Sequence, residues 1–531
     1  MGGIEVSGDM FGVMNRRDVL RGVLLSGGGL AMKGAASPGP VVRTQYGRVR
    51  GEERNGVRVF RGIPYGSASR FLPPSKPSTW KGIFDATVTG PRCVQSPGNL
   101  FLSAAIGEYF RGSKERLDLT AQKDSEDCLN LNVLTPSLTG KRPVMVYLHG
   151  GGFTSGSSLL TLFADAFPRE NDVVLVGVNH RLNVFGYLYL GGLSDRYTVG
   201  NAGQLDLIAA LQWVRANISR FGGDPANVTI FGESGGGGKV STLLAMPQAK
   251  GLFHKAIVES GSVLQVATAE AATESARAAV KKLGLREDQL DRLATVPATQ
   301  LLAAGGGTGP VFDGRSVPRQ TWEPAAPATA AGIPMIVGTC KDESTLFSAS
   351  DPGLFSLRDE DLPARLVKAG IPEADATALL AACRRDHPRD TPTDTWFRIS
   401  SDRGARHRAY AQVERKLQQN AGNVYMYYFS WNTPCVQSSF PLRAFHTAEL
   451  PLAMRCVRYP EAEQLSKQIA RAWAAFARTG NPSHPGLPDW PAFDPTRRSV
   501  MIFDAPESKA VSDPDREQRV IVTNLPSGQA L

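Results

Sequence analysis

The chain has 531 residues, of which 42% are hydrophobic and 21% charged, and these values are typical of a globular protein. Its formal net charge is +9, but lysine and arginine are scattered along the chain, whereas nucleic-acid binding needs them concentrated on one surface. Composition therefore argues against a nucleic-acid partner. After the N-terminal segment no apolar run reaches the roughly 20 residues of a stable membrane span.

Residues 1–36 are expected to be an export signal. Arg16 and Arg17 precede a mildly apolar, glycine-rich run over residues 19–32, and small residues at 34–36 offer a cleavage site. This pattern resembles a twin-arginine signal, which carries proteins that have already folded. We expect export by the twin-arginine machinery and a periplasmic or secreted location. The alternative is an ordinary N-terminus whose arginines occur by chance.

The remaining residues, 37–531, are expected to form a single domain. Short apolar runs without alternation predict strands that are buried on both faces. These runs lie at residues 144–148, 173–176, 228–231, 335–337 and 424–429. Helical patterns lie between them, so the order predicts an α/β fold with a large, mostly parallel central sheet flanked by helices.

Two of the helical patterns are clear in the sequence. Residues 209–214 form one of them, between the second and third predicted strands. Near the end of the chain, helical spacing joins Leu465, Ile469, Trp473 and Phe476. Gly480 follows at the position expected for a C-cap.

Ser234 is the first candidate for a reactive side chain. It lies at the centre of residues 232–236 (GESGG), after the strand predicted at 228–231 and before a helical pattern at 240–246. A G-x-S-x-G motif in this context forces a sharp, strained turn that exposes the serine hydroxyl. We expect Ser234 to be a nucleophile. The alternative, in a chain with 55 glycines, is a glycine-rich loop without chemistry.

A second glycine-rich turn, residues 149–153 (HGGGF), follows the strand predicted at 144–148. Acyl transfer builds negative charge on the carbonyl oxygen of the substrate, and preplaced backbone N–H groups stabilise that charge. Glycines let the backbone approach closely because they carry no Cβ. Gly151 and Gly152 are therefore candidate donors of an oxyanion hole. The alternative is a plain glycine turn.

Further motifs connect the chain to a known family. They are FRGIPY at 60–65, SEDCLNLN at 125–132, NHRLNVFG at 179–186 and FGGDP at 221–225. With the serine motif and HGGGF, they make the chain resemble the type-B carboxylesterase/cholinesterase family, on its bacterial, para-nitrobenzyl-esterase-like side. The resemblance covers about residues 42–504. It implies an α/β-hydrolase fold and a serine carboxylesterase that acts on a small-molecule ester without cofactor or metal.

The resemblance also suggests the acid and the base. On this fold the nucleophile is followed in chain order by the acid and then by histidine. The histidines beyond the expected acid are His387, His407, His446 and His484. Residues 445–450 (FHTAEL) resemble the family's histidine motif, which makes His446 the expected base; a solvent-facing loop histidine is the alternative. Residues 341–344 (KDES) resemble the family's Lys-Asp-Glu-Gly element, which makes Glu343 the expected acid and leaves Asp342 a structural role.

None of the six cysteines has the Cys-x-x-Cys spacing of a metal site, so no zinc site is expected. The resemblance implies a disulfide between Cys93 and Cys128, which an oxidising compartment permits. Cys435 and Cys456 are a weaker candidate pair. Cys340 and Cys383 are expected to be free buried thiols.

Two departures from the family's pattern follow the nucleophile. Gly235 stands where the family commonly has alanine, and its N–H is still expected to be the third oxyanion donor. Lys239 stands on the following helix, where small residues are more usual. It is expected to make a structural ion pair, with Glu259 as the candidate partner. The alternative is that it attracts an acidic substrate.

The family contains several kinds of function. A choline site is not expected, because residues 94–127 contain no tryptophan, the best aromatic partner for a cation. Phe101, Tyr109 and Phe110 in that segment either line a gorge or belong to a lid surface. A broad carboxylesterase is the main hypothesis, and a specialised catabolic esterase for a large anionic, xenobiotic or toxin ester is the alternative. A non-enzymatic adhesion relative is disfavoured, because such proteins usually lose the serine.

Overall fold

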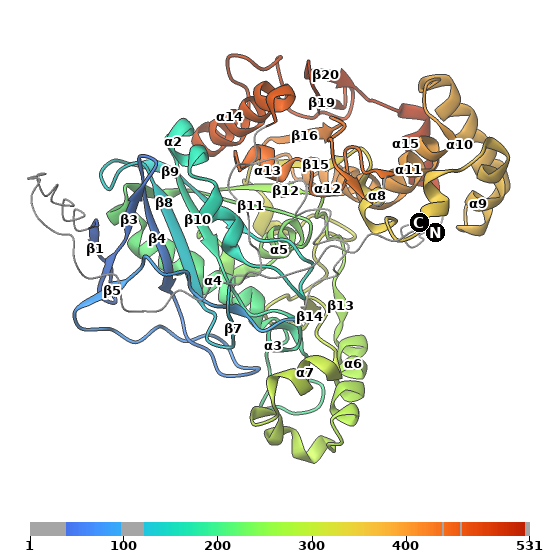
Figure 1. The fold of residues 1–531 in the computed structure, drawn as a ribbon. Coiled ribbons are helices and arrows are strands. Elements are labelled where there is room, and N and C mark those ends of the chain that lie inside the picture. The colour runs from blue at the N-terminus through green and yellow to red at the C-terminus, as the bar shows by residue number, and fades with distance from the viewer. Residues whose placement is uncertain (1–38, 97–121, 438–439, 457–458, 526–531) are drawn as a thin grey trace, which may run out of the picture. The chain divides into compact units, whose positions relative to one another are not determined.

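The computed structural model describes residues 39–96, 122–437, 440–456 and 459–525. Its central element is an 11-stranded sheet whose strands alternate along the chain with helices (Figure 1). From one edge to the other, the strands are β20 (Lys509–Ser512), β19 (Ser499–Phe503), β16 (Val424–Phe429), β15 (Met335–Cys340), β12 (Lys255–Glu259), β11 (Gly223–Glu233), β9 (Arg142–Leu148), β10 (Val174–Val178), β8 (Asn130–Thr135), β4 (Val57–Pro64) and β3 (Glu52–Arg54).

The middle of the sheet is parallel and its edges are antiparallel. All neighbouring strands from β19 to β10 pair in parallel. β20 at one edge, and β8, β4 and β3 at the other, pair antiparallel. The predicted α/β fold with a mostly parallel sheet is therefore confirmed, and the five predicted strands correspond to β9, β10, β11, β15 and β16.

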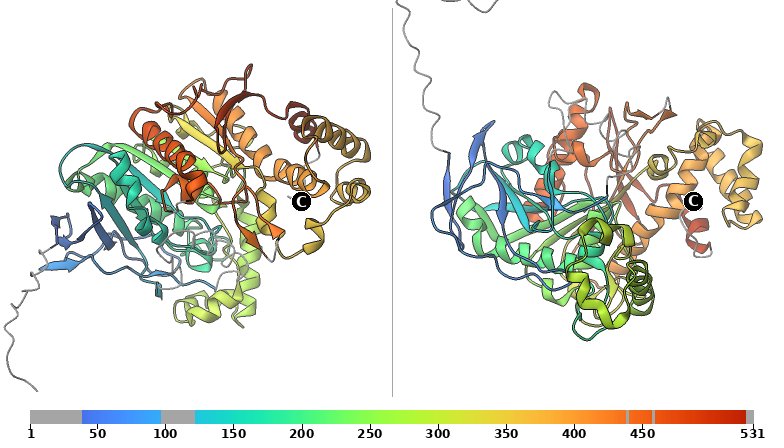
Figure 2. Two further views of the ribbon diagram at one scale, coloured as in Figure 1. Left: turned by 45° about the horizontal axis from the view of Figure 1, so that its top comes forward. Right: turned by 60° about the horizontal axis from the view of Figure 1, so that its bottom comes forward.

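Helices cover both faces of this sheet (Figure 2). Side chains of β9 alternate between two cores: Val144 and Val146 pack with α4, α5 and α12, whereas Met145 and Tyr147 pack with α14. The helices are α2 (Ala166–Asn171), α3 (Asn183–Tyr187), α4 (Ala202–Asn217), α5 (Gly235–Leu243), α6 (Ala269–Lys282), α7 (Ala298–Ala304), α8 (Glu343–Phe347), α9 (Leu362–Lys368), α10 (Glu373–Asp386), α11 (Pro392–Ser401), α12 (His407–Leu417), α13 (Leu450–Ala453), α14 (Glu463–Thr479) and α15 (Arg516–Asn524).

The helix predicted near the end of the chain is α14. Its apolar side chains lie in the second core, where Trp473 is 1% exposed. Gly480 ends the helix with a φ of 82°, and its N–H donates to the carbonyl oxygen of Phe476. Glycine suits this left-handed position because it has no Cβ, so the predicted C-cap is confirmed.

Two groups of helices stand apart from the layers that cover the sheet. α9, α10, α11 and α15 enclose a small core of their own, which includes Leu366, Leu379 and Phe397 (Figure 1). α6 and α7 form the other group. Short sheets complete the fold: β1 (Val41–Arg43), β2 (Arg48–Arg50) and β5 (Ile83–Asp85); β6 (Arg92–Cys93) with β7 (Asp124–Ser125); β13 (Ala267–Thr268) with β14 (Val311–Phe312); and β17 (Val436–Gln437) with β18 (Phe440–Pro441).

The described residues from Gly39 onward form one compact unit, which includes the sheet and both groups of helices. The expected export signal at residues 1–36 lies outside the described residues, as do Phe101, Tyr109 and Phe110. In the described ranges, no helix combines the length and the apolar character that crossing a bilayer requires.

The predicted disulfide between Cys93 and Cys128 is wrong. Both residues are free, buried thiols, and a hydrogen bond between them helps to raise the pKa of Cys128. Cys93 Sγ also accepts the N–H of Leu182 at 3.2 Å. The two thiols therefore meet through non-covalent contacts in the core.

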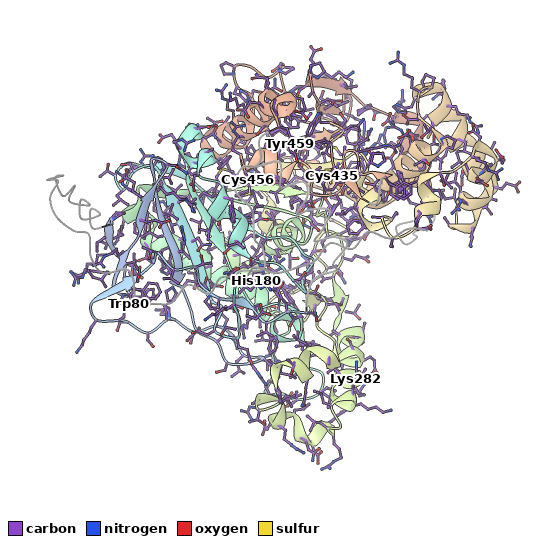
Figure 3. The ribbon with its side chains drawn as sticks, viewed as in Figure 1. Trp80, His180, Lys282, Cys435, Cys456 and Tyr459 are labelled. Carbon is purple, nitrogen blue, oxygen red and sulfur yellow. The ribbon has the colours of Figure 1, made fainter. Side chains whose placement is uncertain are left out.

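Of the other four cysteines, two differ from the prediction and two agree with it. Cys456, labelled with Cys435 in Figure 3, is a free thiol 3.8 Å from the carbonyl oxygen of Leu160, so the weaker candidate pair is also wrong. Cys340 and Cys383 are free and buried, as expected. Cys340 Sγ donates to Glu449 and Cys383 Sγ to Gln518, at 2.8 and 2.9 Å.

Candidate active site

Ser234 lies at the turn between β11 and α5, in the centre of the sheet. Its φ and ψ are 59° and −124°, a strained combination for a residue with a side chain. A Cβ on Gly232 or Gly236 would lie 2.4 or 2.0 Å from the carbonyl oxygen of Leu148, which rules out larger residues there without a shift. The Ser234 N–H donates to the carbonyl oxygen of Glu259 at 2.8 Å. The flanking glycines thus let the elbow pack against β9.

Glu343 is held from the ends of two neighbouring strands. It is the first residue of α8, three residues after the end of β15, and its Oε1 accepts the N–H of Cys340 at 2.8 Å. The same oxygen accepts the Ser260 hydroxyl, which follows β12, at 2.5 Å. The other oxygen is 2.5 Å from His446 Nδ1. Burial opposes the charge of Glu343, but His446 and these donors outweigh it and lower the pKa of the carboxyl.

His446 lies between two carboxylates. Its Nδ1 faces Glu343, and its Nε2 is 3.2 Å from Oε1 of Glu233, the residue before Ser234. Burial disfavours the imidazolium, yet Glu233 and Glu343 outweigh burial and raise the pKa of His446 to about 9. Burial in turn raises the pKa of Glu233 to about 8, although His446 counteracts it. Among the described residues, no hydrogen bond joins Ser234 to His446, and Nε2 of His446 faces the Glu233 carboxyl instead.

Asp342 has the structural role that we expected. It is 2% exposed, and its Oδ2 accepts the N–H of Ala444 at 3.2 Å. The Asp342 N–H donates to the carbonyl oxygen of the same residue at 2.9 Å. Asp342 therefore fixes the backbone two residues before His446 and does not touch the imidazole.

The HGGGF turn, residues 149–153, follows β9 and packs on the first turn of α5. Gly151 and Gly152 have φ values of 87° and 61°, which glycine adopts readily. A Cβ on Gly235 would lie only 2.0 Å from the carbonyl oxygen of Gly152. The three predicted oxyanion donors are therefore adjacent, and the missing Cβ of Gly235 leaves room for the close approach of the turn.

Lys239 holds this turn in place, and the expected ion pair with Glu259 is wrong. Its side chain is buried in α5, and its Nζ donates to the carbonyl oxygens of His149 and Gly152 at 2.9 and 2.7 Å. The same Nζ is 5.2 Å from the ring centre of Phe153. Burial lowers the pKa of Lys239 to about 7. Because the side chain is fully buried, it cannot meet a substrate directly.

Glu259 and Glu449 are two further buried carboxyls. Glu259 accepts Trp473 Nε1 at 3.3 Å, and burial, together with the charge of Glu449, raises the pKa of Glu259. Glu449 accepts the hydroxyl of Tyr427 at 3.0 Å, and its pKa is likewise raised by burial. Neither carboxyl lines the cavity described next.

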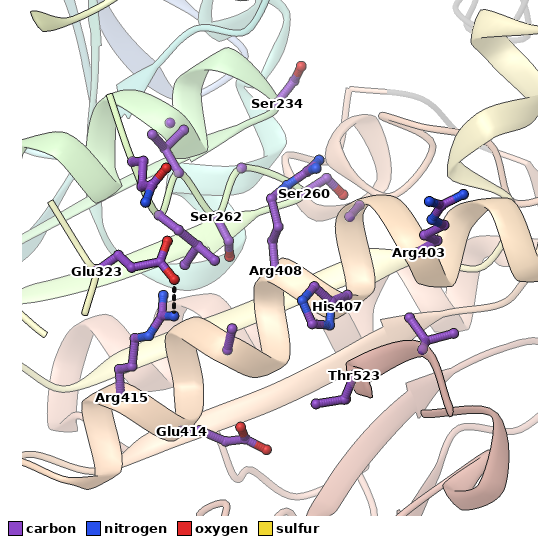
Figure 4. Close-up of a pocket in the computed structure, with 18 of the residues that line it drawn as sticks. Ser234, Ser260, Ser262, Glu323, Arg403, His407, Arg408, Glu414, Arg415 and Thr523 are labelled. Atoms are coloured by element: carbon purple, nitrogen blue, oxygen red, sulfur yellow. Dashed lines mark hydrogen bonds and ion pairs between the residues drawn. The ribbon is translucent and has the colours of Figure 1, made fainter. Parts of the chain in front are cut away.

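A cavity of about 920 Å³ opens beside Ser234 (Figure 4). One wall comes from α5 and the HGGGF turn, another from residues 260–265 after β12, and a third from residues 403–418. This last wall brings His407 and Arg408 to the cavity, and the sequence analysis did not single out Arg408. The sequence of residues 403–408 contains no motif that indicates a cavity. These residues line the cavity only because of the way α12 packs in the folded chain.

His387 and His484 lie away from this arrangement. His387 Nε2 is 2.7 Å from Asp515, and His484 Nε2 is 3.0 Å from the carbonyl oxygen of Gln468. Within the described ranges, no group of three or more His, Cys, Asp or Glu side chains is placed to hold a metal ion. His446 is thus the histidine that meets both a buried acid and the serine elbow.

A mostly parallel sheet with a serine elbow at the centre, followed in the chain by an acid and a histidine, defines an α/β-hydrolase. The family model described as the carboxylesterase family matches residues 38–521, and the chain belongs to this family.

Known relatives support the same assignment. The chain is 37% identical to the para-nitrobenzyl esterase of Bacillus subtilis over 90% of this chain and 97% of that protein. It is 30% identical to the phenmedipham hydrolase of Pseudarthrobacter oxydans over 92% of this chain and 99% of that protein. A solved carboxylesterase of Geobacillus stearothermophilus superimposes with a TM-score of 0.76 at 36% identity, covering 91% and 99% of the two chains. The protein is therefore a carboxylic ester hydrolase.

Proposed function

We propose that the protein hydrolyses carboxylic esters through an acyl-enzyme formed on Ser234, with His446 as the base and Glu343 as the acid. The observation that carries the proposal is His446, whose Nδ1 is bonded to buried Glu343 while Nε2 faces the elbow. A hydroxyl becomes a useful nucleophile only when a base removes its proton. The catalytic hydrogen bond is often absent or long before substrate binds, so the present Nε2 position is compatible with this role.

In the proposed reaction Ser234 Oγ attacks the ester carbonyl while Nε2 of His446 takes the serine proton. Glu343 stabilises the imidazolium that forms. The N–H groups of Gly151, Gly152 and Gly235 are the proposed donors to the oxyanion. The imidazolium then protonates the departing alcohol. Water, deprotonated by His446, attacks the acyl carbon; the bond to Ser234 Oγ breaks, the imidazolium returns its proton to Oγ, and the acid departs.

Hydrolysis of para-nitrophenyl butyrate tests this proposal. The name of one relative refers to a para-nitrobenzyl ester, so neutral aromatic esters are suitable first substrates. Ser234→Ala is expected to lower kcat by at least about 10³-fold, because the covalent route is lost. Ser356→Ala is the matched control, since Ser356 is exposed and lies outside the cavity. Full turnover by Ser234→Ala would refute the proposal, and no turnover by the wild type would favour the adhesion alternative.

We also propose that the twin-arginine segment at Arg16 and Arg17 exports the folded enzyme to the periplasm or beyond. The support is the sequence pattern of residues 1–36. The free buried thiols of Cys93 and Cys128 are compatible with this route, because folding before export does not depend on a disulfide.

A further inference from the structure

The wall of the cavity formed by residues 403–418 is rich in basic side chains, and the acids beside them are already paired. Glu323 is 2.7 Å from Arg415. Glu414 is 2.6 Å from Arg498, which lies outside the cavity. Within the described part of the chain, these two glutamates are the only carboxyl side chains that line the cavity. No lining carboxylate therefore remains to balance the other cations.

Two arginines on this wall have no acidic partner among the described residues. Arg408 is exposed to the cavity and makes no recorded hydrogen bond or ion pair within the described ranges. Arg403 is 9% exposed, donates one bond to the carbonyl oxygen of Ala369, and has an Nε with no partner. A buried guanidinium such as that of Arg403 is unfavourable without a counter-charge, whereas the exposed Arg408 is open to a ligand that supplies one.

The backbone explains how both arginines reach the same cavity. Residues five apart on an α-helix differ in direction by about 140°. Here a π-helical turn, Asp402–Arg406, precedes α12, and the N–H of His407 donates to the carbonyl oxygen of Asp402 five residues earlier. Bonds over five residues bring side chains with that spacing to one side, and such turns are frequent at functional sites. Arg403 and Arg408 accordingly line one wall.

Arg408 is the cation best placed to meet a substrate. Its side chain rises from α12 between Ser260 and Ser262, toward the end of the cavity where Ser234 lies (Figure 4). The surrounding protein lowers the pKa of Arg408, and the negative charge of Glu343 counteracts this change. An arginine in a protein stays charged at any working pH.

We propose that the cavity binds esters that carry a carboxylate, and that Arg408 is the residue that binds this carboxylate. The proposal rests on the proposed esterase function and adds the substrate class to it. A guanidinium matches a carboxylate with two parallel N–H···O bonds, which are stronger than neutral hydrogen bonds. The carboxylate can belong to the acyl part or to the alcohol part of the ester.

Two pairs of esters test the proposal and separate these parts. Mono-para-nitrophenyl glutarate carries the carboxylate in its acyl part and is compared with para-nitrophenyl valerate. 4-Acetoxybenzoate carries it in its alcohol part and is compared with phenyl acetate. In Arg408→Gln, the ratio of kcat/KM for the anionic ester to that for its neutral partner is expected to fall by about 10- to 100-fold in one pair, as for the loss of a charge-assisted hydrogen bond. Arg408→Lys keeps the charge without the fork and is expected to lose less.

Arg471→Gln is the matched control for the loss of one positive charge. Arg471 is exposed on α14, which packs against the opposite face of the sheet from α12. The control is expected to leave both ratios as in the wild type. If Arg408→Gln does not fold, the ratios of Arg408→Lys decide the question in its place.

The outcomes separate the two proposals. If the wild type hydrolyses neutral esters but Arg408→Gln and Arg408→Lys leave both ratios unchanged, the carboxylate site is wrong and the esterase stands. Equal losses in Arg408→Gln and Arg471→Gln also overturn the site, because general charge attraction then explains them. If the wild type hydrolyses none of the four esters, the proposed function itself is wrong.

Discussion

Gly235 and Lys239 both contact the backbone of the HGGGF turn. Replacing them singly and together therefore tests how this turn is held in place. A Cβ on residue 235 would lie 2.0 Å from the carbonyl oxygen of Gly152, whereas real contacts of this kind are rarely shorter than 3.0 Å. In Gly235→Ala the turn must therefore move by about 1 Å. A displacement of this size at an active site can cost about 10²-fold in rate. We expect kcat to fall by about that factor.

Lys239 opposes this movement, because it donates to the carbonyl oxygens of His149 and Gly152. Hydrogen bonds to charged groups contribute about 1.5–3 kcal/mol each. Lys239→Met keeps most of the volume, removes both bonds, and is expected to lower kcat by about 10-fold. In the double variant the turn is free to retreat from the new methyl group. Its kcat is expected to exceed the product of the two single effects by about 10-fold, a coupling of about 1.4 kcal/mol.

The assay is para-nitrophenyl butyrate hydrolysis, with kcat and KM measured for the wild type, both single variants and the double variant. Gly332→Ala is the matched control, because a Cβ there meets nothing within 4 Å. Thermal denaturation shows whether each variant is folded. If the two single effects multiply within about 0.5 kcal/mol, the turn and Lys239 are independent and the reasoning is refuted.

Three further predictions concern the charge on the base, the sheet and export. Glu233→Gln removes a negative charge that favours the imidazolium of His446, so the pKa of His446 is expected to fall. The acid limb of the pH–kcat/KM profile then moves down by about 1–3 pH units, and an unmoved limb contradicts this prediction. Gly338→Ala places a Cβ 2.1 Å from a ring carbon of the neighbouring strand and is expected to lower stability by about 1–3 kcal/mol, measured by urea denaturation; unchanged stability is the contrary result. Replacing Arg16 and Arg17 by lysine is expected to leave the precursor in the cytoplasm, and unchanged secretion in a bacterial host rules the signal out.

Much of the sheet could be predicted because its central strands are buried on both faces. The runs at 144–148 and 424–429 end at the same residues as β9 and β16. The run at 228–231 predicts only the end of β11, which begins at Gly223. Residues 223–227 (GDPAN) are turn formers and polar residues, and the register of β11 with β9 shifts there. Such a segment pairs as a strand because the rest of the fold holds it beside its neighbour. Its hydrophobic pattern does not predict a strand.

The candidate site was predictable where a motif carries the chemistry. The elbow at Ser234 has its own local signal, whereas Glu343 and His446 were found by resemblance. The contacts of Lys239 were not predictable, because they depend on how α5 meets a turn 90 residues earlier in the chain. The prediction of a disulfide between Cys93 and Cys128 was wrong for a simple reason. The motif around Cys128 indicates that Cys93 lies nearby, but it does not indicate whether the two thiols are oxidised to a disulfide.

Glu343 and Arg408, the proposed acid and the proposed carboxylate-binding residue, are held by different parts of the molecule. The Glu343 carboxylate is fixed by the N–H of Cys340 and the hydroxyl of Ser260, both at the ends of sheet strands. The wall that carries Arg408 belongs to a helix on the outer layer. Under the proposed roles, chimeras that exchange residues 402–418 with those of a relative are expected to change the substrate range, because the exchange leaves the strand ends that hold Glu343 intact.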